Sequence, residues 1–317
     1  MEPCLKVSWS SLGAILMWGL LLAVVSPISD LSAMPSPRQA ALCDPTFSDA
    51  ELVPMAVRVR VTGSAQTNTH KPTESDSETT SIGQLTITPI IHASLMLEFC
   101  GKTIHVDPTG DYSGMRKADL ILITDTHGDH FAPSTVTDLY KDGTVMVAPQ
   151  AVATRIETSA TAGGGGAVVI DRRDDQAATI EEVMVLANGD STTVNLQGVS
   201  IQIEAVAAYN LQAGAQARLM HPQGRGNGYV LTFGDKRVFV SGDTECVPEI
   251  RQLENIDIAF LPADPFSTMT AAASAECVKA FGPRAVYPYH YISQDLQGFV
   301  NALSSENVDV RLRSWYQ

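Results

Sequence analysis

A group of strong metal-binding side chains lies within one short segment of this chain, Asp125-Thr126-His127-Gly128-Asp129-His130. Histidine nitrogens and carboxylate oxygens are common zinc ligands, and a catalytic zinc keeps one position open for water. The segment directly follows Leu120–Thr124, an apolar run typical of a buried strand. Because catalytic loops often follow the carboxyl ends of strands, we expect a metal site in this loop.

Two later segments also end an apolar strand in a single metal-binding side chain. Asp243 follows the run Val238–Ser241, and His290 follows Val286–Tyr289. Side chains at the ends of such strands meet where the strands share one edge of a sheet. We therefore expect Asp243 and His290 to converge with the first group.

The apolar runs that position these residues predict many strands first and helix–strand alternation later. The second half of the chain repeats the strand and helix pattern of the first, which indicates two sheets stacked between helices, an α/β sandwich. Residues 156–180 contain four consecutive glycines and a charged run, so we expect a surface excursion there. The expected strands are 85–91, 94–99, 102–106, 119–124, 145–147, 183–186, 193–196, 199–206, 228–233, 237–241, 256–261, 285–288 and 308–312. The expected helices are 134–140, capped by Ser134, 247–253, 271–281, capped by Thr270, and 296–303.

The amino-terminal part has the composition of a targeting segment and a linker. Residues 1–33 combine Lys6, the apolar run Leu12–Val25 and small residues before a cleavage point at Ala33, as in a secretory signal peptide. The alternative is an uncleaved signal anchor. Residues 34–82 form a low-complexity linker that we expect to be mostly disordered. The mature protein is then exported to the periplasm or secreted, and residues 83–317 form its domain.

The five cysteines show no CxxC spacing and predict no disulfide framework. Export would allow disulfides. We nevertheless expect Cys100, Cys246 and Cys277 to be small buried residues. The alternative for Cys246 is a role at the site, because it follows Asp243 closely.

The charge argues against one class of partner. A net charge of −14 and a pI near 4.8 disfavour nucleic acid, since phosphate binding needs clustered lysine and arginine. We expect a small-molecule substrate and no membrane association after signal cleavage. The sequence carries no signal for oligomeric state.

Together, Asp125-x-His127-x-Asp129-His130, Ser241-Gly242-Asp243-Thr244 and His290 resemble the metallo-β-lactamase superfamily over residues 83–317. The stretch His221–Tyr229 is similar to its exported bacterial branch, related to L-ascorbate 6-phosphate lactonase-like proteins. The resemblance implies an αββα four-layer sandwich. It also implies a metal-dependent hydrolase.

The resemblance divides the ligands between two metal sites. One site keeps its full set, which is Asp129, His130, Asp243 and His290. The other keeps His127 and the shared Asp243. The family's first histidine is replaced by Asp125, and a histidine after the central strand is replaced by Asn210.

This pattern implies one firm metal site and a second that is weak or absent. Zinc is expected, with iron or manganese as alternatives. Asp125 remains an oxygen donor for the second site. Asn210 is a poor ligand, and His221 is either a rim residue or the replacement ligand.

The expected chemistry is attack by a metal-activated water on an ester, lactone, amide or phosphoester. Asp129 would orient the water. His92, near the rim, would contribute to catalysis or be a structural histidine. Asp107 would support the ligand loop. The alternative function is a catalytically degenerate binding protein of the same fold, which the Asp125 and Asn210 replacements favour.

Overall fold

The computed structural model describes residues 74–161, 168–170, 178–180, 183–211, 220–292 and 294–316. The expected signal peptide, residues 1–33, lies outside this part of the chain, as does most of the expected linker. Within the described ranges, no helix is both long and apolar enough to cross a membrane.

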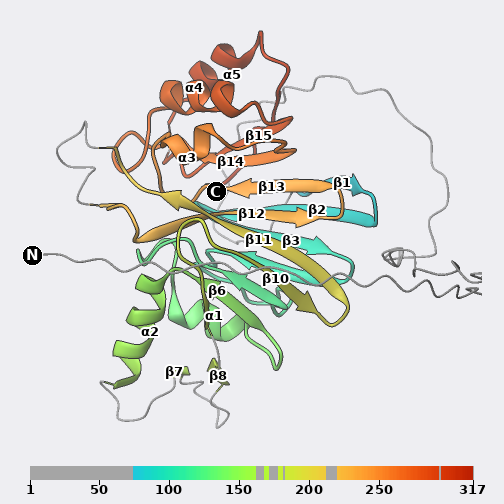
Figure 1. The fold of residues 1–317 in the computed structure, drawn as a ribbon, viewed down its shortest axis with the longest axis vertical. Helices are drawn as coiled ribbons and strands as arrows, with labels where there is room; N and C mark the ends of the chain where they lie inside the picture. Colours follow the sequence, from blue (N-terminus) through green and yellow to red (C-terminus); the bar gives the residue numbers. More distant parts are fainter. Residues whose placement is uncertain are drawn as a thin grey trace, which may run out of the picture. The chain divides into compact units, whose positions relative to one another are not determined.

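The first half of the domain builds one sheet of seven strands, in the order β1-β2-β3-β4-β5-β6-β9 (Figure 1). Antiparallel pairing joins β1 through β4, and parallel pairing joins β4, β5, β6 and β9. The strands are β1 Asp76–Thr80, β2 Gly83–Ile91, β3 Ser94–Phe99, β4 Lys102–Val106, β5 Leu120–Leu122, β6 Val145–Ala148 and β9 Val183–Val185.

The second half builds a matching sheet of seven strands, in the order β10-β11-β12-β13-β14-β15-β16. Its first four strands are antiparallel, and β13 through β16 are parallel. The strands are β10 Ser191–Leu196, β11 Val199–Ala208, β12 Gly226–Phe233, β13 Lys236–Val240, β14 Ile258–Pro262, β15 Ala285–Tyr289 and β16 Asp309–Val310. A separate small sheet pairs β7 Val168–Ile170 with β8 Ala178–Ile180.

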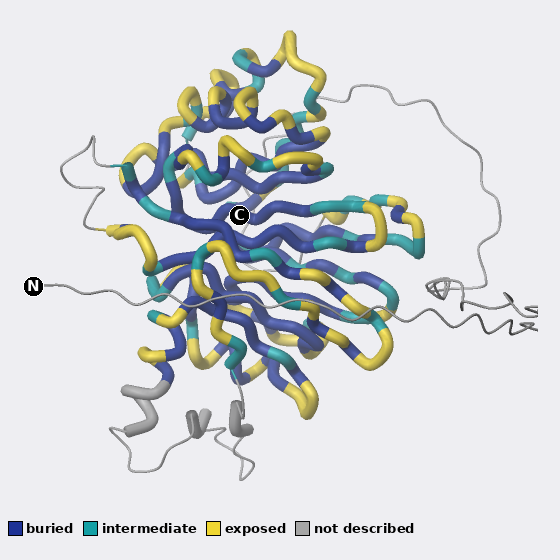
Figure 2. Tube along the Cα trace, in the orientation of Figure 1, coloured by how far each residue is buried: buried dark blue, intermediate teal, exposed yellow. Residues whose placement is uncertain are grey.

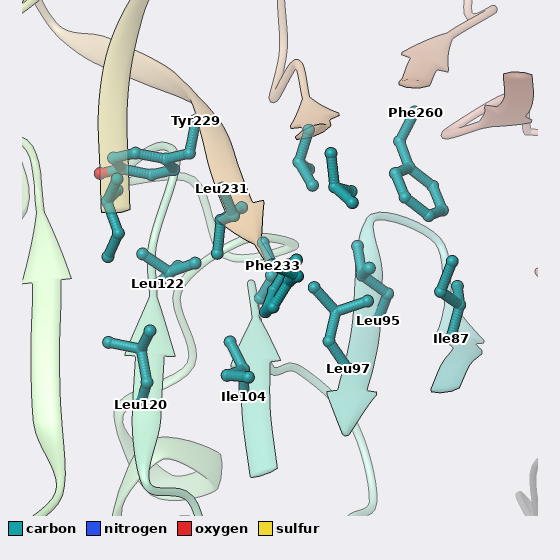
Figure 3. Close-up of a cluster of buried hydrophobic side chains, with 14 of the residues drawn as sticks. Ile87, Leu95, Leu97, Ile104, Leu120, Leu122, Tyr229, Leu231, Phe233 and Phe260 are labelled. Carbon is teal, nitrogen blue, oxygen red and sulfur yellow. The ribbon is translucent and has the colours of Figure 1, made fainter. Parts of the chain in front are cut away.

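Three apolar clusters of described residues hold the layers together. The central one lies between the sheets, where Leu97 and Leu120 of the first face Leu231 and Phe260 of the second (Figure 3). A second packs the outer face of the second sheet against α3 Pro248–Arg251, α4 Ala271–Phe281 and α5 Gln297–Leu303. A third packs the outer face of the first sheet against α1 Pro133–Leu139 and α2 Gln150–Thr161. This arrangement confirms the expected αββα sandwich.

The buried strands explain why the sequence folds this way. All residues of β5, β14 and β15 are buried, because each strand has a sheet core on one face and helices on the other (Figure 2). Continuous apolar runs are typical of such strands. By contrast, β10 alternates exposed and covered residues, since it lies at the edge of its sheet.

The first strand starts inside the segment expected to be linker. Asp76–Thr80 pairs with β2 although every residue in it is polar. Its side chains are held by ion pairs, because Arg313 contacts Asp76 at 2.6 Å and Arg311 contacts Glu78. The ordered domain therefore begins before residue 83, and hydrophobic patterning could not locate this strand.

One predicted helix cap and one predicted surface excursion need correction. Ser134 is not the cap of α1, because the helix begins at Pro133 and is preceded by Ala132, which makes no side-chain cap bond. Proline suits this position, since the first helical N–H has no partner. Helix α2 occupies the start of the segment expected to be a surface excursion. The predicted Thr270 cap of α4 is confirmed, as its side chain accepts from the Ala273 N–H.

The prediction that the cysteines form no disulfide is wrong. Cys246 and Cys277 are joined by a disulfide that links the segment after Asp243 to helix α4. The two residues are 31 positions apart in the chain. Both are buried as expected, but the fold brings them together, which spacing alone could not show.

The strand directions gather the functional loops at one edge of the sheets. Because β4, β5 and β6 run parallel, the loops after their last residues share one edge. The same holds for β13, β14 and β15 of the other sheet. Bonds across the two sheets close this edge, since the Asn227 N–H donates to the Thr124 carbonyl and the His290 N–H donates to the His92 carbonyl.

Candidate metal centre

The loop after β5 is fixed by Asp107, which follows β4. One Asp107 carboxylate oxygen accepts from the Thr124 N–H at 2.7 Å. The other lies 2.7 Å from Nδ1 of His130 and also accepts from the Thr124 hydroxyl. Asp107 therefore supports the ligand loop and leaves Nε2 of His130 as the nitrogen that faces the site. Such a carboxylate behind a histidine is the usual support of a metal ligand.

Four of the expected ligands converge from three strands. Nε2 of His130 lies 3.3 Å from Oδ2 of Asp243, and Nε2 of His290 lies 3.2 Å from Oδ1 of the same residue. Oδ2 of Asp129 lies 3.5 Å from His290 Nε2 and 3.9 Å from His130 Nε2. The structure thus brings Asp129, His130, Asp243 and His290 around one point.

Several of these atoms are buried and have no hydrogen-bond partner in the described part of the chain. They are Nε2 of His130, Oδ1 of Asp243 and both ring nitrogens of His290. Their mutual distances are short, yet their orientations do not make hydrogen bonds. Buried polar atoms without partners are costly, unless a bound ion satisfies them. The residues therefore fit a metal ion, with two imidazoles and two carboxylates as donors.

The charges of the cluster also favour a cation. Burial would raise the pKa of Asp243, but His290 and His130 lower it well below its ordinary value. Burial would likewise raise the pKa of Asp129, which His290 and His92 instead lower. Both carboxylates are thus ionised at neutral pH. Conversely, burial would lower the pKa of His130, yet Asp243 and Asp107 raise it well above its ordinary value.

Unusual backbone conformations mark the same region. His92, Asp107 and His290 have φ angles of 54°, 46° and 46°, in the left-handed region that non-glycine residues rarely adopt. Gly242 has φ 62°, and a Cβ there would lie 2.8 Å from Cβ of Thr124. Such strain clusters at functional sites, where the surrounding structure holds it in place.

The other half of the site contains Asp125, His127 and His221. Nδ1 of His127 lies 3.4 Å from Oδ1 of Asp125 and 3.3 Å from Nε2 of His221. His221 also reaches Asp243, with Nε2 3.0 Å from Oδ2. These positions place His221 in the cluster itself and not at a distant rim.

Asn210 lies behind His221. Its Oδ1 is 2.9 Å from Nδ1 of His221, and its Nδ2 donates to the Ser267 carbonyl. Both polar atoms of the amide are therefore engaged away from the centre. Asn210 therefore orients His221. The sequence predicted His221 as either a rim residue or the replacement ligand.

Arg225 is a residue that sequence reasoning missed. Its Nε and Nη2 donate to the Asp125 carboxylate at 3.0 to 3.2 Å, and Nη2 also lies 3.1 Å from Nε2 of His127. A buried charge is usually paired, so an aspartate buried in a metal-ligand position indicates a positively charged neighbour. Nothing in the spacing identified which of the arginines it is.

His92 lies at the open side of the half of the site that Asp129, His130, Asp243 and His290 form. Its Nε2 is 3.0 Å from Oδ2 of Asp129, and its Nδ1 bonds to the Tyr316 hydroxyl. Its ring centroid lies 3.8 Å from that of His290. Because an ionised Asp129 only accepts, His92 Nε2–H donates to it and the Tyr316 hydroxyl donates to Nδ1.

The site opens to solvent on one side. The side chains of Asp129, His127 and Arg225 are 46, 34 and 22% exposed, whereas those of His130, Asp243 and His290 are at most 3% exposed. Three large hydrophobic side chains lie exposed on the loops of this edge: Met220 precedes His221, Phe266 precedes Ser267, and Ile292 follows His290 by two residues.

Comparison with known proteins agrees with this architecture. The beta-lactamase superfamily domain matches residues 86–290. A UPF0173 metal-dependent hydrolase of Thermus thermophilus is 26% identical over 242 residues, covering 69% of this chain and 91% of the relative. A UPF0173 metal-dependent hydrolase of Geobacillus thermodenitrificans is 27% identical over 227 residues, covering 67% and 90%.

Solved structures give the same result. The crystal structure of a putative metal-dependent hydrolase from Parabacteroides distasonis is 37% identical, with a TM-score of 0.65, and covers 77% of this chain and 99% of that one. Igni18, a metallo hydrolase from Ignicoccus hospitalis, shares the fold at 19% identity, with a TM-score of 0.56 over 74% of this chain and 96% of its own.

The chain belongs to the beta-lactamase superfamily. This confirms the resemblance at the level of the superfamily and the expectation of a metallohydrolase. The narrower relation to the exported, ascorbate phosphate lactonase-like branch stays a prediction.

Proposed function

We propose that the protein is a hydrolase that uses one metal ion, held by Asp129, His130, Asp243 and His290, to cleave a small-molecule substrate. The observation that carries the proposal is the set of buried ligand atoms without hydrogen-bond partners in this half of the site. The metal is zinc by preference, and iron or manganese would suit the same donors.

When bound, the metal supplies a water of lowered pKa, from about 15.7 to about 7, and a positive charge for the developing oxyanion. The chain's own residues determine where that water lies. Asp129 is the ligand that also reaches solvent, so its carboxylate can accept a hydrogen bond from the attacking water. Its lowered pKa keeps it ionised for this role.

The Tyr316–His92–Asp129 chain of hydrogen bonds positions that carboxylate. Tyr316 donates to His92, and His92 donates to Asp129. The Asp129 carboxylate thus has one oxygen engaged, while Oδ1 makes none of these contacts. We assign Oδ1 as the oxygen that orients water, and His92 as the group that fixes it and lies within reach of the substrate.

The substrate is an ester, lactone, amide or phosphoester with an apolar part. The reacting carbonyl or phosphoryl group is the kind of centre that a metal-activated water attacks. The apolar part is supported by the exposed Met220, Phe266 and Ile292, since large exposed hydrophobic side chains around a site commonly bind ligands.

Metal content and turnover of the purified protein test the proposal. After metal-replete expression, we expect about one equivalent of zinc, iron or manganese in the wild type and much less in His130→Ala. His105→Gln is the matched control, because His105 is a buried histidine of β4 outside the ligand set. Absence of stoichiometric metal in the wild type would contradict the proposal.

A panel of lactones, esters, amides and phosphodiesters tests the chemistry. We expect turnover of at least one class by the wild type and a loss of at least 100-fold in Asp129→Ala. Equal turnover by both proteins would assign the activity to a contaminant. A metal-loaded protein without turnover of any class would instead favour the degenerate binding protein.

A further inference from the structure

We propose that the guanidinium of Arg225 takes the place of a second metal ion and binds an oxygen of the substrate's reacting group. The inference rests on the proposed function, because it assigns the half of the site next to the single metal. It commits the substrate to an accessible carbonyl, carboxylate or phosphoryl oxygen beside the bond that is cleaved.

Arg225 lies where a second metal ion would have its ligands. Its Nη2 atom lies 3.0 Å from both carboxylate oxygens of Asp125 and 3.1 Å from Nε2 of His127. Asp125, His127 and His221 could by themselves hold an ion, since their ligand atoms lie within 4.8 Å of one another. A permanently charged group therefore already lies against two of these three residues.

Arg225 supplies a hydrogen bond to His127 within this half of the site. Arginine only donates, so Nε2 of His127 accepts from Arg225 and its proton is on Nδ1. Nε2 of His221 faces both Nδ1 of His127, at 3.3 Å, and Oδ2 of Asp243, at 3.0 Å. The His221 Nδ1–H in turn donates to the Asn210 amide oxygen and the Ser267 carbonyl.

The two halves of the site differ in which buried ligand atoms have hydrogen-bond partners. Among the described residues, the buried ligand atoms without partners belong to His130, Asp243 and His290, and none belongs to Asp125 or His221. The first half of the centre therefore offers unpartnered donor atoms to a metal ion, whereas in the second half the guanidinium of Arg225 already lies against Asp125 and His127. This explains why Asp125 can replace a histidine, because a carboxylate pairs with a guanidinium where an imidazole would not.

The remaining face of Arg225 points to a ligand. Its Nη1 atom makes no hydrogen bond to the described part of the chain, and the side chain is 22% exposed. Nε and Nη2 are held by Asp125, so the guanidinium plane is fixed before substrate arrives. A fixed donor next to a metal can stabilise negative charge on a substrate oxygen without reorganisation.

Zinc stoichiometry is the first test, measured by elemental analysis after saturation and dialysis. We expect one zinc per chain in the wild type and in Arg225→Lys. We expect two in Asp125→His/Arg225→Ser, which restores a histidine and removes the guanidinium. Arg284→Ala is the charge-matched control, because Arg284 is 80% exposed and precedes β15, at the opposite end of the strand from His290.

Oxyanion binding is the second test, measured by calorimetry with inorganic phosphate on protein loaded with one equivalent of zinc. A hydrogen-bonded charge contact is worth about 1.5–3 kcal/mol, which corresponds to about 10- to 100-fold in affinity. We expect Arg225→Ala to weaken phosphate binding by at least tenfold. We expect Arg284→Ala to bind as the wild type does, and circular dichroism checks that each variant is folded.

The outcomes separate this inference from the proposed function. Two zinc ions in the wild type would overturn the inference, as would equal phosphate affinity in the wild type and Arg225→Ala. Failure of the wild type to bind phosphate would also overturn it. No bound metal in the wild type would instead overturn the proposed function. Phosphate titration of the metal-free wild type and of metal-free Arg225→Ala would then test the guanidinium by itself, and equal affinities would overturn the inference.

Discussion

The Nδ1 nitrogen of His130 lies 2.7 Å from Oδ2 of Asp107, and neither side chain is exposed to solvent. This contact fixes which nitrogen of His130 faces the other ligands. It also joins the ends of β4 and β5, because Asp107 accepts from the Thr124 N–H. The relationship predicts that a residue outside the ligand set controls metal affinity.

Asp107→Asn is expected to weaken metal binding by about 10- to 100-fold, the usual effect of removing a carboxylate behind a ligating histidine. The amide oxygen can still accept from Thr124, so the loop keeps its anchor. Competition with a chromophoric chelator measures the affinity. Asp119→Asn is the matched control, since Asp119 also accepts a backbone N–H but lies before β5, at the opposite end of that strand from the ligand loop. Equal affinity in Asp107→Asn and the wild type would contradict the prediction.

The candidate ligands were predictable from sequence because each follows a strand that is itself easy to identify. Leu120–Leu122, the Val-Phe-Val end of Lys236–Val240, and Ala285–Tyr289 are apolar and end just before a ligand or a ligand loop. The parallel pairing of such strands then places the loops together. The apolar periodicity likewise predicted the two sheets and their helical layers.

Other parts of the site depend on contacts that the sequence does not encode locally. Arg225 is 100 residues from Asp125, and no spacing rule connects them. Strand β1 is polar because it is an edge strand held by ion pairs, so its composition resembled a linker. The Cys246–Cys277 pairing depends on how α4 packs, which periodicity does not give.

We propose that the mature protein is exported, and the Cys246–Cys277 disulfide supports this. Disulfides persist in oxidising compartments and are rare in the cytosol. Cell fractionation is expected to find the protein in the exported fraction, with mass spectrometry showing a new amino terminus near residue 34. A full-length protein in the cytosol with both thiols reduced would contradict the proposal.

Loss of this disulfide is expected to lower stability without changing the ligands. A bridge across 31 residues restricts the unfolded chain by about 3 to 4 kcal/mol in the chain-entropy description. Cys246→Ser/Cys277→Ser should lose about that much free energy of unfolding, measured by denaturant titration of the metal-loaded protein. Reduction of the wild type by a strong reductant is the parallel measurement. An unchanged midpoint in both would show that the bridge does not stabilise the fold.

Phe266 is expected to bind the apolar part of the substrate, because its side chain is 74% exposed on a loop next to His221. Phe266→Ser should raise KM about fivefold for a substrate with a long acyl group, since covering part of an aromatic ring is worth about 1 kcal/mol. Its kcat should stay unchanged. A short substrate with the same reacting group is the internal control, and its KM should not move. Equal shifts for both substrates would mean that Phe266 acts on the reacting centre or on folding.

The acid stability of the protein is expected to depend on His105, whose side chain is buried in β4 away from the ligands. Its Nε2–H donates to the Arg116 carbonyl, and its Nδ1 has no hydrogen-bond partner among the described residues. Burial lowers the pKa of His105 to about 4, although the bond to Arg116 opposes this shift. The folded state therefore keeps the ring neutral at pH values where the unfolded chain is protonated.

The pKa of His105 in the folded state lies below its unfolded value of 6.5. Protonation of His105 therefore leaves stability unchanged above about pH 6.5 and destabilises the fold as pH falls toward 4. Between pH 7.5 and 5.0 this destabilisation amounts to about 2 kcal/mol. His105→Gln keeps a donor for the Arg116 carbonyl but does not titrate. Denaturant unfolding at both pH values should show that the wild type loses about 2 kcal/mol more than the variant. The metal ligands titrate equally in both proteins, so an identical pH dependence would contradict the assignment to His105.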